Sequence, residues 1–345
     1  TGTISLTSAL SGMGNLSFTA NEVNWTAAIA GTGTLTLKPT TATNVINIGA
    51  ASDAGTSTLD ILASELALLG STFTGVTIGG GSQSGNISIA AASSFVSPVI
   101  FTTSGSTILS GNLTSSGSAG ITVTNGLQVS GAARTITSAS GDITLAAVDA
   151  TGTAYGLTLT TTSGTINVAR VGGTSALASL TTSAGGTTNF TGAGVTTTGA
   201  QTYNNAVTLA ADNAFTTTNN AILFASTVNS ASSTPRALTA NAGTSTITFT
   251  GAVGGSQGLG NISLTSTGIT TISSTINAAA LTQNSITGTT AINGGSITTT
   301  GVQAYGNAVT LGSALTTLST TNSNITFSNT LNSTTSSRAL TLSAG

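Results

Sequence analysis

The sequence predicts an all-β protein whose chain coils into a parallel β-helix, also called a β-solenoid. Short runs in which apolar residues alternate with Thr or Ser occur throughout the chain, and Gly, Asn or Ser separates them. Alternation with a period of two is typical of β-strands, and the separating residues favour turns. Long internal repeats are the second observation. The third is a charged fraction of only 3%, against about 25% in ordinary soluble domains.

The long repeat is defined by three arginines, Arg134, Arg236 and Arg338, which lie 102 residues apart and open similar segments. Residues 186–199 resemble residues 288–301 at the same offset, and the similarity continues into 201–209 and 303–311. A finer similarity relates residues 171–180 to 253–264 at an offset of 82. The two offsets differ by 20, which predicts rungs of about 20 residues and about five rungs in each long repeat.

The elements are predicted from this pattern in chain order. Residues 1–130 form the less repetitive segment, with strands expected at 34–37, 87–89 and 121–123. Residues 58–70 suit one or two helical turns, so a short helix is expected at 64–69, with Ser64 as its cap and Gly70 as its stop. Residues 131–345 carry the long repeats, with strands expected at 143–145, 157–160, 247–249, 262–264 and 325–327.

We expect residues 1–345 to form one continuous solenoid without a linker, as part of a longer chain. The last arginine block ends at Gly345, whereas a complete solenoid normally closes with an atypical polar cap. In each rung, strands would pair in parallel with those above and below, so that interior apolar residues stack into ladders. Val123, Phe224 and Phe327 are expected in one interior ladder, with Thr122 and Thr326 facing outward and Leu223 breaking that pattern.

The composition removes most catalytic and binding chemistries. The chain has no Cys and no His, so it lacks the residues that most often act as metal ligands, thiolate nucleophiles or general bases at neutral pH. Its five basic residues are spread along the sequence, whereas nucleic-acid binding needs clustered Lys and Arg. No apolar run reaches the length of about 18 residues that suggests a membrane-spanning helix. We therefore expect no cofactor, no nucleic-acid partner and no membrane span in this segment.

The few carboxylates are interpreted as structural. Asp60 and Glu65 lie five residues apart, but no aromatic platform accompanies them, and a carboxylate pair without a motif is weak evidence of catalysis. Asp142 and Asp149 flank a predicted strand, yet the Gly-Gly-x-Gly-x-Asp repeat of calcium-binding β-rolls is absent. We therefore predict no catalytic, cofactor-binding or metal-binding residue.

Three further residue types receive structural interpretations. A polysaccharide lyase would gather Asp, Lys and Arg on one sheet face, whereas Lys38, Arg134 and Arg170 lie at least a rung apart in sequence. The repeated arginines are expected to cap turns by donating to backbone carbonyls. Tyr203 and Tyr305 are expected to be buried anchors with hydrogen-bonded hydroxyls.

Residues 14–25, 31–39, 59–73 and 76–79 follow one another in a characteristic order, and residues 201–209 form a further distinctive segment. The first four segments resemble a recurring segment of large bacterial surface exoproteins of the filamentous haemagglutinin type, and residues 201–209 resemble another. The resemblance implies a right-handed parallel β-helix, export from a Gram-negative type of cell, and a role in adhesion or surface structure.

We therefore expect an extracellular structural or adhesive fibre or stalk at a bacterial surface, not an enzyme. Free strand edges at both ends would allow self-association into filaments, and the other expected partners are a cell surface or matrix. The main alternative is a carbohydrate- or receptor-binding adhesin module, which would need an aromatic-lined concave site, although Trp25 is the single tryptophan. Two minor alternatives are a polysaccharide lyase and an ice-binding surface, whose Thr ladders would have to repeat on every rung.

Overall fold

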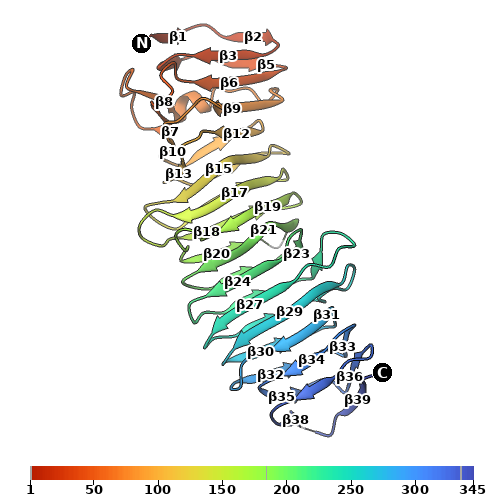
Figure 1. Cartoon of the computed structure of the whole chain (residues 1–345). Helices are drawn as coiled ribbons and strands as arrows, with labels where there is room; N and C mark the ends of the chain where they lie inside the picture. The colour runs from red at the N-terminus through yellow and green to blue at the C-terminus, as the bar shows by residue number, and fades with distance from the viewer. Residues whose placement is uncertain (1, 184, 335) are drawn as a thin grey trace. The chain divides into compact units, whose positions relative to one another are not determined.

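The computed structural model of the chain describes residues 2–183, 185–334 and 336–345, which form 39 β-strands and one short helix (Figure 1). The chain divides into two compact units, Thr1–Val168 and Ala169–Gly345. In both units parallel strands stack into a right-handed β-solenoid, which confirms the predicted fold class. A single continuous solenoid over residues 1–345 stays a prediction.

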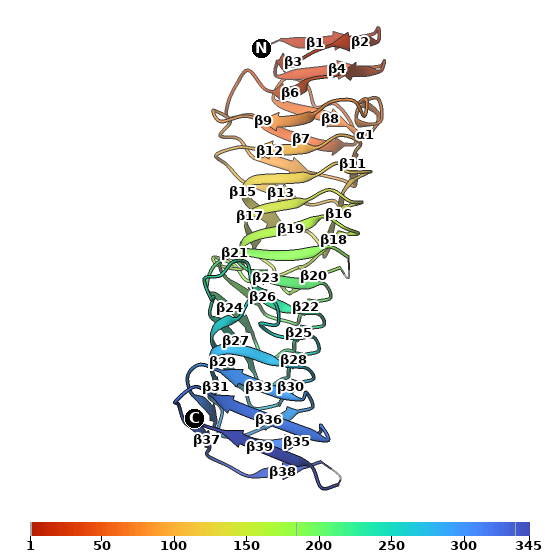
Figure 2. The same cartoon turned by 90° about the vertical axis from the view of Figure 1, so that its right-hand side faces the viewer.

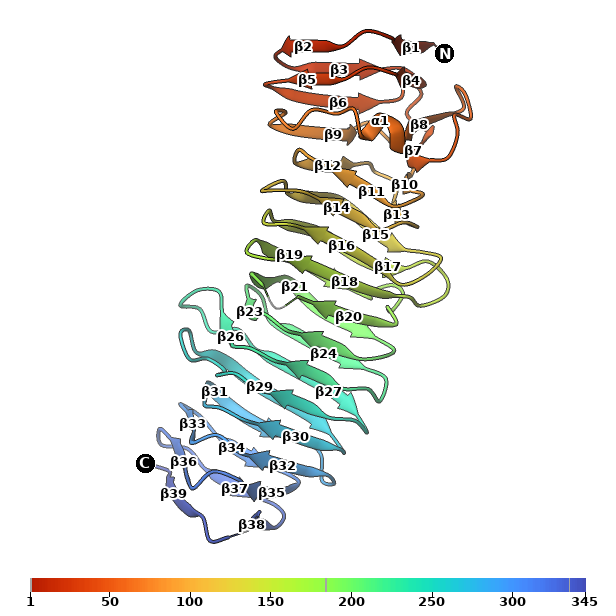
Figure 3. The same ribbon diagram turned by 180° about the vertical axis from the view of Figure 1, so that it is seen from behind.

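The first unit contains the helix and the strands up to the start of β19. Its elements are β1 (Thr3–Leu6), β2 (Leu10–Met13), β3 (Leu16–Thr19), β4 (Glu22–Trp25), β5 (Ile29–Gly31), β6 (Thr34–Lys38), β7 (Val45–Ala50), β8 (Thr58–Leu62), α1 (Ala63–Leu66), β9 (Gly75–Gly79), β10 (Ile87–Ile89), β11 (Ser93–Phe95), β12 (Val99–Thr102), β13 (Thr107–Leu109), β14 (Leu113–Ser115), β15 (Ile121–Val129), β16 (Arg134–Ser138), β17 (Ile143–Ala150) and β18 (Gly156–Thr161). Figure 3 shows β11, β14, β16 and β18 stacked in that order.

The second unit continues with strands alone among its described residues. They are β19 (Thr165–Val171), which begins in the first unit, β20 (Ser179–Thr182), β21 (Thr187–Thr197), β22 (Gln201–Tyr203), β23 (Ala206–Leu209), β24 (Asn213–Thr217), β25 (Ile222–Phe224), β26 (Val228–Ser230), β27 (Leu238–Gly243), β28 (Ile247–Phe249), β29 (Leu259–Ser266), β30 (Ile269–Ile272), β31 (Ile276–Gln283), β32 (Thr289–Ile292), β33 (Ser296–Thr299), β34 (Gln303–Tyr305), β35 (Ala308–Leu311), β36 (Leu315–Thr320), β37 (Ile325–Phe327), β38 (Leu331–Ser333) and β39 (Ala339–Ser343). Figure 2 shows β22, β25, β28 and β30 one beneath another.

Each rung of the second unit has three faces, and some long strands bend around a corner to serve two of them. The first residues of β31 pair with β33, whereas its last three pair with β34. We call the ladder of β20, β22, β25, β28, β30, β32, β35 and β38 the β22 face. The ladder of β24, β27, β29, the end of β31, β34 and β37 is the β34 face.

The rungs are longer than the sequence offsets suggested. On the β22 face, the residues that pair in turn from one rung to the next are Gln201, Ile222, Ile247, Thr270, Thr290, Val309 and Leu331. The six steps from Gln201 to Leu331 cover 130 residues, or about 22 residues each. The predicted rung of about 20 residues was therefore slightly short. A repeat of 102 residues is about four and two-thirds rungs, not the predicted five, because turn lengths vary from rung to rung.

Because the long repeat is not a whole number of rungs, equivalent residues of successive repeats lie on different faces, and the prediction of one shared interior ladder is wrong. Phe224 lies in β25 on the β22 face, whereas Phe327 lies in β37 on the β34 face, although the two phenylalanines occupy equivalent places in the long repeats. Val123 lies in the first unit, stacked between Phe101 and Leu145. Each residue does point inward, but they belong to separate ladders.

Apolar side chains fill the interior because alternate residues of each strand point inward. Val123 and Phe224 are fully buried, whereas Phe327 is half-buried because no strand pairs with β37 on its outer side among the described residues. Thr326 is exposed, and Thr122 and Leu223 occupy the half-buried outward positions of their strands. The alternation was therefore predicted correctly, and Leu223 follows it as an outward apolar residue.

The predicted short helix exists, but it begins and ends earlier than expected. Helix α1 covers Ala63–Leu66, and single turns continue to Leu69. Ser64 lies inside the helix, and the Glu65 carboxylate caps it by accepting from the Leu62 N–H at 2.8 Å. None of the described helices is long and apolar enough to cross a membrane.

Candidate functional site

Three carboxylates meet in the first unit, at the insertion formed by β7, the loop 51–57 and β8. Glu22 opens β4, Asp53 lies in the loop, and Asp60 lies within β8. Figure 2 shows β4, β7 and β8 close to α1 at this end of the unit. One oxygen from each of the three carboxylates lies within 4.8 Å of the others. We call Glu22, Asp53 and Asp60 the carboxylate cluster.

Local pairing brings Asp60 into the carboxylate cluster. Strands β7 and β8 pair in parallel with Asp60 opposite Asn47, so the loop between the strands must fold back over β8. The Asp60 Oδ1 accepts from the Asn47 amide at 2.9 Å. Its Oδ2 accepts from the Ala54 N–H at 2.9 Å and from the Thr58 hydroxyl at 2.8 Å. These bonds fix a carboxylate that is almost fully buried.

Asp53 is the exposed member of the cluster. Its Oδ1 accepts from the Gly55 N–H at 2.6 Å, and its Oδ2 accepts from the Asn24 amide at 3.1 Å. The Gly55 N–H is the largest influence that lowers the pKa of Asp53, since hydrogen bonding to the charged form favours ionisation. Asp53 therefore presents a negative charge at the open side of the cluster.

Glu22 is the least satisfied member. It is 1% exposed, and its Oε1 accepts from the Val23 N–H at 3.1 Å. No N–H or O–H group of the described residues donates to its Oε2, and the only polar side chain facing this carboxyl closely is Asp53, with which a protonated Glu22 shares its proton. Burial is the largest cause that raises the pKa of Glu22 to about 8, followed by the charge of Asp53. A buried anion that faces other anions needs a proton or a cation.

Glu65, which the sequence paired with Asp60, has a separate structural role. Its Oε1 accepts from the Trp25 N–H at 2.9 Å, and the Trp25 indole N–H donates to the Glu65 carbonyl at 2.7 Å. Burial is the largest cause of the raised pKa of Glu65. Glu65 therefore caps α1 and anchors the buried single tryptophan, as a structural interpretation predicts.

The sequence analysis missed the carboxylate cluster because its members are 31 and 7 residues apart. One signal was available: Glu22, Asp53, Asp60 and Glu65 are four of only seven acidic residues, and all lie in the first 65 positions. Asp142 is elsewhere, and its Oδ1 accepts from the Thr165 N–H at 2.7 Å. Asp149 lies in β17, away from the cluster in sequence and rung.

The repeated Arg and Tyr residues have the local roles shown by their contacts. The Arg134 Nε donates to the Ser130 carbonyl at 3.0 Å, which confirms the predicted turn cap. The Nε atoms of Arg236 and Arg338 are buried and have no hydrogen-bond partner within the described residues, so the turn cap that the Arg134 Nε makes is not repeated by these two atoms. Tyr203 and Tyr305 are fully buried and donate to Gln201 and Gln303 at 3.0 Å, as predicted.

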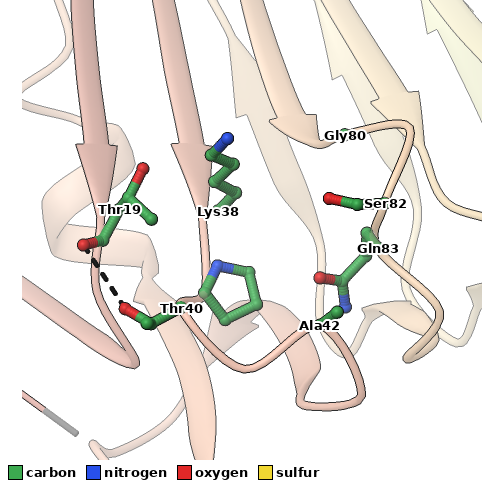
Figure 4. Close-up of a pocket in the computed structure, with 8 residues that line it drawn as sticks. Thr19, Lys38, Thr40, Ala42, Gly80, Ser82 and Gln83 are labelled. Atoms are coloured by element: carbon green, nitrogen blue, oxygen red, sulfur yellow. Dashed lines mark hydrogen bonds between the residues drawn. The ribbon is translucent and has the colours of Figure 1, made fainter.

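Lys38 is one of the residues that line a small polar pocket, or hollow, on the first unit (Figure 4). The hollow encloses about 110 Å³, against roughly 300 Å³ or more for typical ligand pockets. The Thr40 hydroxyl donates to the Thr19 carbonyl across its edge at 3.5 Å, and the Gln83 amide donates to the Asn44 carbonyl at 2.6 Å. The residues that line the hollow are Thr19, Lys38, Pro39, Thr40, Ala42, Gly80, Ser82 and Gln83. This lining does not provide the aromatic platform that a carbohydrate site would need.

Two of the basic residues weighed for a lyase lie on different rungs of the first unit. Lys38 ends β6 and Arg134 opens β16, several rungs later in the first unit. Arg170 lies in the part of β19 that belongs to the second unit.

Compared with known proteins, the chain matches no family model, no curated protein and no solved structure.

Proposed function

We propose that the chain is part of an extracellular structural or adhesive fibre or stalk at a bacterial surface. The observation that carries the proposal is the coil-on-coil pairing of strands in both units. Each rung obtains its hydrogen bonds and its apolar contacts from its two neighbours. A structure of this kind can lengthen rung by rung without needing a larger core.

The outer surface suits such a fibre because hydroxyl side chains, which are solvated without carrying charge, form columns along it. One outward column of the first unit runs through consecutive paired strands and is interrupted by a single apolar residue; its members are Ser17, Thr36, Thr77, Ile100, Thr122 and Thr144. Ile100 is 36% exposed. This interruption weighs against a uniform Thr surface for ice binding.

The bacterial surface location is supported by the resemblance to filamentous haemagglutinin-type exoproteins. That resemblance is carried by residues 14–25, 31–39, 59–73, 76–79 and 201–209. Adhesion would then come either from the solenoid surface or from a binding tip elsewhere in a longer polypeptide. Strand pairing between the end rungs of neighbouring copies would extend the fibre.

The test is immunogold electron microscopy of intact source cells with antibodies raised against the purified chain. We expect label along thin structures outside the cell, without permeabilisation. Label that appears only after lysis would contradict the surface location. Incubation of the purified chain with polysaccharides provides a second test, since release of reducing or unsaturated ends would contradict a structural role.

A further inference from the structure

The carboxylate cluster contains a buried acid with an unpartnered oxygen that faces two further carboxylates. Glu22 is 1% exposed, and within the described ranges no donor reaches its Oε2. We propose that Glu22, Asp53 and Asp60 bind one calcium ion, which joins β4, β8 and the loop 51–57. The donor set consists of oxygens alone, which hard cations such as Ca²⁺ prefer over softer transition metals.

The spacing of the three oxygens suits calcium. Calcium–oxygen distances of about 2.3–2.6 Å allow two ligands of one ion to lie up to roughly 5 Å apart. The three oxygens lie within 4.8 Å of one another. Magnesium binds at about 2.0–2.1 Å, requires stricter octahedral geometry and gives up its water ligands reluctantly, so a site with a flexible exposed loop such as 51–57 favours calcium.

The surrounding groups orient the carboxylates without neutralising them. Asp60 accepts from Asn47, Ala54 and Thr58, and Asp53 accepts from Gly55 and Asn24. Every one of these donors is an uncharged amide, hydroxyl or backbone N–H. Such outer hydrogen bonds are what hold metal ligands in place.

No cationic side chain takes the place of an ion. In the parts of the chain that the structure describes, no Lys or Arg pairs with Glu22, Asp53 or Asp60. Asp53 is exposed, so an ion can enter from its side and retain water molecules as further ligands. Calcium has six to eight oxygen ligands in proteins, so three carboxylates and several waters complete the site.

The experiment is isothermal titration of CaCl₂ into the purified chain after removal of metal with EDTA and desalting. We expect one ion per chain with a dissociation constant between about 10⁻⁶ and 10⁻³ M, and a rise in Tm with calcium concentration. Terbium provides a local readout, because emission sensitised by the single tryptophan, Trp25, requires an ion near β4. Magnesium titrated in the same way should bind more weakly.

Two variants test the ligands. Glu22→Gln keeps the size of the side chain and an oxygen that can accept from Val23, and Asp53→Asn changes an exposed loop residue and keeps an oxygen that can accept from Gly55. Each should weaken calcium binding at least about 10-fold. Asp142→Asn is the matched control, because Asp142 is also exposed and also accepts a backbone N–H. It should bind calcium as the wild-type chain does.

Circular dichroism establishes that each variant is folded. The proposal is overturned if the wild-type chain gives no calcium heat and no rise in Tm. It is equally overturned if Glu22→Gln and Asp53→Asn both bind calcium with wild-type affinity. A third contrary result is loss of binding in Asp142→Asn alone, which would place the ion elsewhere.

Discussion

At the scale of single residues, Glu22 is the side chain whose charge conflicts most with its surroundings. It is buried at the start of β4, against Asp53 and Asp60, and one of its oxygens has no donor in the part of the chain that the structure describes. The conflict has a measurable consequence in the metal-free chain, because a buried carboxylate without a cation is most stable when it carries a proton.

We expect the metal-free chain to lose stability as pH rises from about 4.5 to about 8. The pKa of Glu22 rises from 4.5 to about 8 in the folded chain, so the folded state holds a proton that the unfolded state has released. The free energy of unfolding therefore falls as pH rises across this window. Below the window Glu22 is protonated in both states and adds no pH dependence to the free energy of unfolding. Thermal unfolding in EDTA across the window measures the effect, and Glu22→Gln should flatten the curve. A Tm that rises with pH in the wild-type chain would contradict this assignment.

The buried tyrosines give a second prediction at this scale. Among the described residues, Tyr203 alone donates to the Gln201 Oε1, at 3.0 Å. Tyr203→Phe leaves that buried oxygen unpaired and should lower the free energy of unfolding by about 1–3 kcal/mol. Tyr305→Phe should cost a similar amount, because Tyr305 donates to Gln303 in the same geometry. Urea denaturation measures both, and Tyr155→Phe, at a half-buried tyrosine, should change stability by less than about 0.5 kcal/mol.

At the scale of elements, stability arises from stacking between equivalent positions of successive strands. Phe224 of β25 stacks on Tyr203 of β22 with ring centroids 5.0 Å apart, and on Phe249 of β28 at 5.1 Å. Phe327 of β37 has one such partner, Tyr305 of β34, at 5.1 Å. Within the described residues, β25 therefore makes two stacked aromatic contacts from the middle of its ladder, whereas β37 makes one at the end of its ladder.

This difference predicts unequal costs for the same substitution. Phe224→Ala should lower the free energy of unfolding by about 3–5 kcal/mol, because the side chain is fully buried between two rings. Phe327→Ala should cost less than about 3 kcal/mol, because Phe327 is half-buried. Guanidinium denaturation of the two variants provides the comparison. Equal losses would mean that end rungs are packed as tightly as interior ones.

At the scale of each whole unit, the long repeat shows that one sequence segment can form the same structure on different faces of the second unit. Gln201 on the β22 face donates to the carbonyls of Val195 and Thr216. Gln303 on the β34 face donates to the carbonyls of Ile297 and Ser319 at nearly equal distances. The same sequence phrase therefore builds the same local network on two different faces.

Because each rung depends only on its neighbours, removal of one complete rung should be tolerated. Deletion of residues 270–289 places Thr290 on Ile247 and Ile292 on Phe249, where Thr270 and Ile272 lie in the intact chain. We expect β-rich circular dichroism, cooperative unfolding and a Tm close to that of the intact chain. Loss of cooperative unfolding would contradict rung-by-rung additivity.

A single added side chain between rungs should be worse than the loss of a whole rung. A Cβ at Gly294 would lie 2.1 Å from the Ser274 carbonyl oxygen of the preceding rung. Gly294→Val therefore forces two backbones apart and should lower Tm more than the deletion of residues 270–289. Parallel thermal scans of the two variants test this order.

The sequence by itself determined the strands, their inward and outward residues, and the parallel solenoid fold, because alternation and turn residues act over a few positions. It also identified Tyr203 and Tyr305 as buried anchors, whereas the structure identified their partners, such as Gln201 for Tyr203. Only the tertiary structure decided the rung length and the face on which each repeat lies, because these depend on turn lengths summed over whole rungs. It alone also assembled Glu22, Asp53 and Asp60, since the pairing of β7 with β8 and the fold of the loop 51–57 bring together carboxylates that no local pattern connects.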